Sequence, residues 1–189
     1  MLFRSRFSQN RREGPSTIYG LPVIHEGRLY VAGGGDLWWG KNQAWLKSYD
    51  LNTPPHATTA PTTEAPALRW SYPLEKHVMA TPAVADGLAF IVDCGRTFHC
   101  VDAATGQRIW TADIKGEVCA SPMVADGKVY LGTRSGDFYV FAASREKQLL
   151  ATIDLGNPIS ATVTPANGVL YIATMNRLYA VQSGAQLPR

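Results

Sequence analysis

The sequence predicts an all-β protein: a β-propeller of about four four-stranded antiparallel blades in an open or partial ring. Two observations lead to this fold class. A segment that begins at Thr81 recurs at Ser121, so that the pair Asp86-Gly87 reappears 40 residues later as Asp126-Gly127. Short apolar and β-branched runs separate these turn signals, and they show no 3.6-residue periodicity. A four-stranded unit that repeats about every 40 residues is typical of a propeller blade.

Residues 1–15 are predicted to form a polar, basic arm ahead of the first blade, or the remnant of a preceding blade. The basic cluster of this arm consists of four arginines, and the whole sequence has a formal net charge of only +3. No stripe of basic residues with interleaved aromatic residues accompanies the cluster, so the composition gives no indication of nucleic-acid binding. Neither a secretory signal nor an apolar run approaching about 18 residues is visible, so the chain itself carries no sequence evidence of export or of a membrane span.

The first predicted blade, residues 16–74, is longer than the others. We expect its four strands at residues 18–24, 28–32, 44–49 and 68–72. A long loop is predicted at residues 33–43, with the three glycines at 33–35 as its flexible base. Residues 52–67 are an inserted Pro/Thr-rich loop, because this composition is typical of a surface excursion without a core.

Three compact blades are predicted to follow, at residues 78–114, 118–154 and 158–182. In the first of these we expect strands at residues 80–85, 88–93, 97–101 and 108–114. The pair Asp86-Gly87 joins the first two strands, since both residues tolerate the positive φ of a two-residue hairpin turn. The next blade repeats this pattern, and the last one lacks a fourth strand.

The first and fourth strands of the predicted blades differ in the size of their side chains. The first strands carry small residues, which suits crowding near a central axis: Ala80, Ala83, Ala120, Ser121, Ser160 and Ala161. The fourth strands carry Trp70 and Trp110, each 17 residues before the glycine of the next Asp-Gly turn. Because one Trp buries about 150–250 Å², we expect both side chains to dock neighbouring blades, which is a structural role.

These motifs resemble a known family. The pattern Ser-Pro-x-Val-Ala-Asp-Gly-x-Val-Tyr-x-Gly-Thr-x-x-Gly at residues 121–136, with Asp-Ala-x-Thr-Gly-x-x-x-Trp at residues 102–110, is similar to the pyrroloquinoline-quinone (PQQ)-like propeller repeat. That repeat occurs in PQQ alcohol dehydrogenases and in outer-membrane assembly lipoproteins of the BamB type. The resemblance covers roughly residues 16–182 and implies an exported, periplasmic bacterial protein. It implies little about activity, because the repeated residues build blades rather than sites.

Three arrangements of the ring would fit the predicted number of blades. Residues 2–7 would complete the fourth blade and close a small ring, or two chains would form a ring of eight. In the third arrangement, the chain is the C-terminal part of a longer protein and forms an open arc. We favour the third, because the families that this chain resembles usually have larger rings.

Three cysteines are present, Cys94, Cys100 and Cys119. Cys94 and Cys100 flank a short turn, so they either point to opposite faces of the sheet or lie about 13 Å apart along it. Neither geometry permits a disulfide, whose Cα atoms lie within about 7 Å. We expect three reduced, mostly buried thiols, and a pairing of Cys119 with either of the others stays open.

No catalytic residue, cofactor site or metal site can be placed on the sequence. The PQQ enzymes that the chain resembles need a complete ring, a cation held by carboxylate and amide ligands, and often an adjacent cysteine pair, which this chain lacks. We therefore expect no cofactor, including PQQ with Ca²⁺. A metal site at His99 and Cys100 is disfavoured, because adjacent strand residues point to opposite faces and no CxxC or HxxxH spacing occurs.

The departure from the repeat at residues 36–43 is the leading candidate for binding. Trp38, Trp39, Lys41 and Asn42 would form a sugar-stacking or peptide-binding surface, since binding residues are often held on loops of a rigid scaffold. Alternatively, this loop folds over its own blade or packs on a blade outside this chain.

The sequence as a whole predicts a non-catalytic scaffold for binding or assembly, of the exported BamB-like kind. Its partners would be a protein or glycan at the blade-end loops, and missing blades from the same or another chain. A fragment of a PQQ-dependent dehydrogenase and a polysaccharide-binding propeller are the alternatives.

Overall fold

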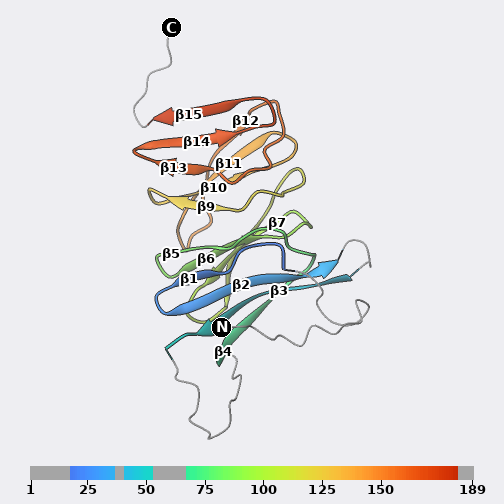
Figure 1. The fold of residues 1–189 in the computed structure, drawn as a ribbon, viewed down its shortest axis with the longest axis vertical. Helices are drawn as coiled ribbons and strands as arrows, with labels where there is room; N and C mark the ends of the chain where they lie inside the picture. Colours follow the sequence, from blue (N-terminus) through green and yellow to red (C-terminus); the bar gives the residue numbers. More distant parts are fainter. Residues whose placement is uncertain (1–17, 37–40, 53–66, 183–189) are drawn as a thin grey trace, which may run out of the picture.

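Four antiparallel sheets stack along the long axis of the computed structural model, which describes residues 18–36, 41–52 and 67–182 (Figure 1). Three of the sheets have four strands and the last has three within these residues. In every sheet the strands are paired in chain order, and every pair is antiparallel. The described chain is therefore all-β, with about four blades in an arc that does not close, which confirms the predicted fold class.

The strands follow one another in four groups, from the blue end of the chain to the red end (Figure 1). Blade 1 contains β1 (Val23–His25), β2 (Arg28–Asp36), β3 (Lys41–Asp50) and β4 (Ala67–Leu74). Blade 2 contains β5 (Ala83–Ala85), β6 (Leu88–Val92), β7 (Thr97–Asp102) and β8 (Arg108–Asp113). Blade 3 contains β9 (Met123–Ala125), β10 (Lys128–Gly132), β11 (Asp137–Ala142) and β12 (Leu149–Asp154). Blade 4 contains β13 (Thr164–Ala166), β14 (Val169–Ala173) and β15 (Leu178–Gln182).

The two-residue turns have the predicted backbone conformation. Asp86 and Gly87 have φ values of 49° and 72°, and Asp126 and Gly127 have values of 50° and 65°. Two positive φ values in succession define the turn whose twist matches that of a hairpin. The same conformation recurs in blades 1 and 4, so the repeated dipeptide fixes the register between the first two strands of every blade.

The first strands are shorter than predicted. We expected strands at residues 18–24 and 80–85, but β1 begins at Val23 and β5 at Ala83. A proline lies directly before each of these strands, at positions 22 and 82. Because proline has no backbone N–H to donate to a strand ladder, pairing begins after it.

The predicted loop at residues 33–43 was wrong, because β2 and β3 extend through most of it. Gly33 pairs with Trp45 in the ladder, and a register shift follows between Gly34 and Asp36. Gly35 has a φ of 74°, and a Cβ added there would lie 2.2 Å from Cβ of His77. The glycines therefore form a β-bulge against the connector that leads to blade 2, rather than the base of a flexible loop.

The hydrophobic core lies between the sheets. A large cluster joins blades 1, 2 and 3, and β6 in its middle is buried at all five positions. A smaller cluster joins blades 3 and 4, with five buried members: Phe138, Val140, Ile159, Val163 and Ile172. Blade 2 is therefore the most enclosed sheet of the described chain.

Candidate binding surface and the junctions between blades

Two of the four residues predicted to bind a ligand belong to the longest hairpin of the described chain. Lys41 and Asn42 begin β3, whereas Trp38 and Trp39 lie outside the described residues, between β2 and β3. The strands β2 and β3 have 9 and 10 residues, compared with 5 and 6 for β6 and β7. The hairpin of blade 1 is therefore several residues longer than a blade requires.

A cation–π pair lies on this hairpin. The Nζ atom of Lys47 is 4.3 Å from the ring centroid of Trp45, and both side chains are half-buried. Residues two apart in a strand point to the same face, which brings the two side chains together. Sequence reasoning missed this pair, although its alternating spacing was a usable signal.

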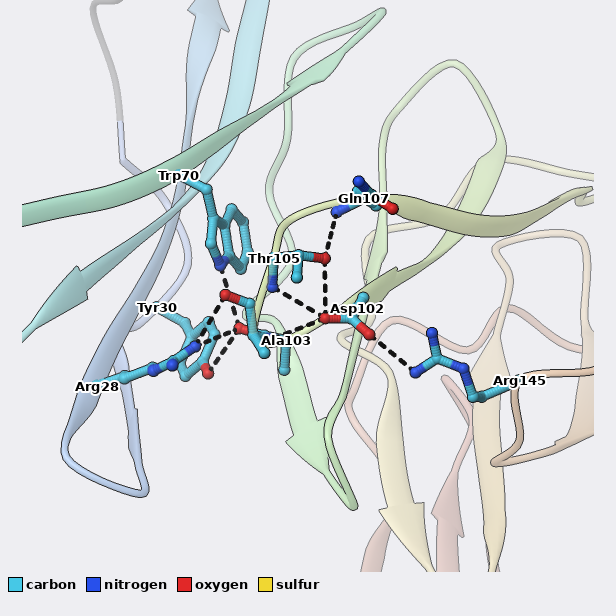
Figure 2. A network of polar contacts seen from close by, with 9 residues as sticks. Arg28, Tyr30, Trp70, Asp102, Ala103, Thr105, Gln107 and Arg145 are labelled. Carbon is cyan, nitrogen blue, oxygen red and sulfur yellow. Dashed lines mark hydrogen bonds and ion pairs between the residues drawn. The ribbon is translucent and has the colours of Figure 1, made fainter.

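A tight turn at Asp102 organises the junctions of blade 2 with both neighbours (Figure 2). Oδ1 of Asp102 accepts hydrogen bonds from the backbone N–H groups of Ala104 and Thr105, at 3.0 and 2.9 Å, and from the Thr105 hydroxyl at 2.9 Å. Asp side chains stabilise turns by bonding backbone groups two or three residues ahead. The Asp-Ala-x-Thr-Gly motif is thus a self-capped turn that holds its carbonyl groups in fixed directions.

Blade 1 binds one carbonyl of this turn. The oxygen of Ala103 accepts hydrogen bonds from Nη1 of Arg28 at 3.0 Å, the Tyr30 hydroxyl at 3.2 Å and Nε1 of Trp70 at 3.1 Å (Figure 2). A Cβ added to Gly106 would lie 2.6 Å from the Trp70 ring, so this glycine permits the indole to lie directly against the turn. The structure thus places Trp70 in contact with the next blade.

Blade 3 binds the other side of the same turn. Nη1 of Arg145 lies 2.8 Å from Oδ2 of Asp102 (Figure 2). This hydrogen bond, opposed by partial burial and reinforced by the donors of the turn, lowers the pKa of Asp102. Trp110 donates from Nε1 to the oxygen of Ser144 at 3.0 Å, and its ring stacks on that of Phe141 with centroids 5.9 Å apart. Both tryptophans therefore contact the following blade, but only Trp70 meets the Asp-Ala-x-Thr-Gly turn.

The arginines and Tyr30 were not predicted from the sequence. Arg28 and Tyr30 lie more than 70 residues from Ala103, and Arg145 lies 43 residues from Asp102. No local motif connects residues so far apart. For Arg145 a partial signal exists, because the third repeat carries Ser144-Arg145 where the second has Ala104-Thr105.

A buried polar cluster joins blades 1 and 2. The Tyr72 hydroxyl on β4 is 3.0 Å from Nδ1 of His99 on β7, and Nε2 of His99 lies 3.6 Å from Oδ2 of Asp93. Asp93 is fully buried, and neither Oδ2 of Asp93 nor Nε2 of His99 has a hydrogen-bond partner. Burial raises the pKa of Asp93 most strongly, but the nearby imidazole and the Thr97 N–H together outweigh it and leave that pKa lowered.

A shallow groove of about 380 Å³ follows the first strands of the blades. Its lining contains apolar and hydroxyl side chains and no charged ones: Val23, Thr81, Pro82, Ala83, Val84, Ala85, Ser121, Pro122, Met123, Val124 and Thr162. Three hydrogen bonds of the same type connect successive blades along this groove. The N–H of Leu21 donates to Oγ1 of Thr81 at 2.9 Å, and the N–H of Thr81 donates to Oγ of Ser121 at 2.9 Å. The N–H of Ser121 donates to Oγ1 of Thr162 at 3.1 Å. The hydroxyl groups of this groove therefore hold blades together.

Two further findings concern possible metal and membrane sites. Within residues 18–36, 41–52 and 67–182, no group of three or more His, Cys, Asp or Glu side chains is arranged so that it could hold a metal ion. The same part of the chain has no helix with the length and hydropathy needed to cross a lipid bilayer.

Comparisons with known proteins agree with this architecture. A family profile described as "Outer membrane protein assembly factor BamB" matches residues 59–149. The solved structure of BamB from Moraxella catarrhalis superposes with a TM-score of 0.68 and 18% identity, covering 88% of this chain and 47% of that one. Residues 59–149 are thus similar to the BamB-like family of PQQ-like repeats, and the described chain shares the fold of a solved BamB structure.

Two other comparisons give a similar sequence and a similar fold. The chain is 35% identical to a quinohemoprotein alcohol dehydrogenase of Comamonas testosteroni, over 43% of this chain and 13% of that protein. It also superposes on the computationally designed Ika4 protein with a TM-score of 0.68 and 14% identity, covering 91% of this chain and 94% of that one. The PQQ-like repeat of this chain thus spans less than half of BamB and a small part of the dehydrogenase.

Proposed function

We propose that this chain is a non-catalytic scaffold that binds polypeptide segments during assembly in the bacterial cell envelope. It would act as part of a larger exported, periplasmic protein. The observation that carries this proposal is the β2–β3 hairpin, which extends beyond the length that the other blades use.

The hairpin is suited to binding because its base is held firmly. The bulge at Gly35 packs on His77 of the connector to blade 2, and Lys47 lies over Trp45 on the strand. This base adjoins Lys41 and Asn42 at the start of β3, and Trp38 and Trp39 lie between β2 and β3 in the sequence. Aromatic residues with a few polar neighbours on a fixed support are typical of binding hot spots.

The repeated polar residues, by contrast, are used within the protein. Asp102, Trp70, Trp110 and the hydroxyl groups of the groove all bond neighbouring blades. These contacts support a structural role for the repeated residues. Binding would then fall to the β2–β3 hairpin, which departs from the repeat. The family description names outer membrane protein assembly, so we propose an unfolded segment of an outer-membrane protein as the partner.

The test is a binding measurement with labelled peptides that correspond to strands of an outer-membrane β-barrel protein. Fluorescence anisotropy should give a Kd for the native chain that rises about tenfold or more in the double variant W38A/W39A, the loss expected for a hot spot. The matched control is Tyr19→Ala, which removes an aromatic side chain that is 51% exposed elsewhere on blade 1. Equal affinities for the native chain and the double variant would contradict the proposal.

One observation favours a second candidate, a fragment of a PQQ-dependent dehydrogenase. The curated relative with 35% identity is a quinohemoprotein alcohol dehydrogenase. Adding PQQ with Ca²⁺ to the purified chain, and following quinone absorbance and alcohol-dependent dye reduction, separates the two candidates. Dye reduction that depends on both additions would replace the scaffold by the enzyme fragment.

A further inference from the structure

Two of the three cysteines lie where blades 2 and 3 meet. Cys94 is in the turn between β6 and β7, and Cys119 is in the connector between β8 and β9. Both are free thiols and are half-buried, whereas Cys100 is free and fully buried inside β7. Solvent thus has partial access to the first two and none to the third.

The repeat indicates that the segments carrying these two cysteines lie side by side. At the junction of blades 3 and 4, the N–H of Ile159 donates to the oxygen of Thr133 at 2.9 Å, and at the junction of blades 1 and 2 the N–H of Val78 approaches the oxygen of Gly34 at 3.4 Å. Val118 lies 40 residues after Val78, and Asp93 lies 40 residues before Thr133, so these two are the equivalent residues at the junction between blades 2 and 3. One residue further along each segment are Cys119 and Cys94.

Contacts within the same junction support this placement. The N–H of Ile114, at the start of the connector, donates to the oxygen of Arg96 in the turn at 2.8 Å. Burial raises the pKa of Cys94 to about 12, and the next largest contribution comes from Cys119. The Cys94 and Cys119 thiols therefore lie within the range over which their charges would interact.

We infer that Cys94 and Cys119 form a redox-sensitive thiol pair that an external disulfide oxidises to a covalent bond between blades 2 and 3. In the first step, a thiolate of the pair attacks one sulfur of a small-molecule disulfide, breaks its S–S bond and releases one small-molecule thiolate. The second cysteine then loses its proton to solvent, attacks the protein sulfur of this mixed disulfide and releases the second small-molecule thiolate. Two protein thiols are oxidised and one disulfide molecule is reduced to two thiols.

Apart from the backbone of the connector itself, this bond would be a covalent cross-link at a junction otherwise held by non-covalent contacts. Its loop would contain the whole of β7 and β8, because the two cysteines are 25 positions apart. Exported proteins meet oxidising surroundings in which such bonds persist. The inference does not require the proposed scaffold function, since it depends only on the junction.

The first test exposes the reduced chain of 189 residues to oxidised glutathione at mildly alkaline pH, where more thiolate is present. Remaining thiols are then alkylated in denaturant, and peptides are mapped by mass spectrometry. We expect one disulfide-linked peptide pair that contains Cys94 and Cys119, with Cys100 alkylated. Recovery of Cys94 and Cys119 as alkylated thiols, or only as separate glutathione adducts, would overturn the inference.

A second test measures proximity without oxidation. Phenylarsine oxide binds two thiols that lie close together, so the native reduced chain should take up one equivalent. The variants Cys94→Ser and Cys119→Ser should each lose this uptake, while Cys100→Ala, a control outside the pair, should keep it. Uptake by the native chain no greater than that of the two serine variants would show that the thiols are too far apart.

Discussion

The junction between blades 1 and 2 and the junction between blades 3 and 4 use the same repeat with very different completeness. At the first, one carbonyl receives three donors and the indole of Trp70 is only 9% exposed. At the second, the half-buried Ala151 lies opposite Val140 at the position of the tryptophans, and the preceding Leu150 is 44% exposed. A tryptophan beside a capped turn thus gives a junction both a buried ring and a directional hydrogen bond, whereas an apolar residue alone gives partial burial.

The largest effect should come from removing the indole at the first junction. Trp70→Ala removes a buried ring and leaves Ala103 with one donor fewer, so we expect the free energy of unfolding to fall by about 3–5 kcal/mol. Leu150→Ala should cost about 1 kcal/mol or less, because that side chain is already half in solvent. Urea unfolding followed by circular dichroism measures both, and equal losses would break the comparison.

The next effect separates packing from backbone strain at the turn beneath Trp70. Gly106 and Gly87 have φ values of 74° and 72°, but an added Cβ meets the Trp70 ring only at Gly106. Gly87→Ala should therefore cost about 1–2 kcal/mol from the left-handed conformation alone. Gly106→Ala should cost about 1–3 kcal/mol more from overpacking. A difference near zero between the two alanine variants in denaturant unfolding would mean that the indole moves freely away from the turn.

The buried carboxylate of Asp93 should give the first junction a pH-dependent stability that the junction of blades 3 and 4 lacks, because Thr133 replaces Asp93 in blade 3. The pKa of Asp93 is lowered in the folded state, so the unfolded state binds a proton more readily. The stability from this carboxylate is present above its unfolded pKa of about 3.9 and is lost as pH falls through the folded value. Unfolding free energies of the native chain and Asp93→Asn, measured from neutral to acidic pH, should converge on acidification, and parallel curves would exclude this role.

The smallest effect should come from Arg145, whose side chain is 66% exposed. Arg145→Ala should lower stability by less than about 1 kcal/mol, because solvent screens an exposed ion pair. Measurement at low and high salt provides the check, since the difference between native chain and variant should shrink as salt rises. A large loss that salt does not change would mean that Arg145 holds the junction by packing rather than by charge.

The sequence predicted the blades well because their determinants are local. An Asp-Gly pair needs only its own backbone to form a turn, and its recurrence after 40 residues fixes the length of each unit. The glycines at 33–35 were misread because a β-bulge and a flexible loop have the same composition. Only the packing of Gly35 on His77 distinguishes the two, and that contact lies 42 positions away along the chain.

The junction chemistry was only partly predictable for the same reason. The Asp-Ala-x-Thr-Gly motif indicated a turn, but not that its carbonyl receives donors from Arg28 and Tyr30. The cluster of Tyr72, His99 and Asp93 likewise assembles across two sheets. The predicted ligand residues Trp38, Trp39, Lys41 and Asn42 remain a prediction, supported by the length of their hairpin alone.

The hydrogen bonds that cross the inner groove all point the same way along the chain: an amide of one blade donates to a hydroxyl of the next. Such a series has a polarity but no fixed length. Duplication of one module would therefore conserve every bond in the series, provided that the new copy carries a serine or threonine at the same place. A gene encoding this arc can thus change its number of blades by whole-unit copying, with no compensating mutation at the inner rim.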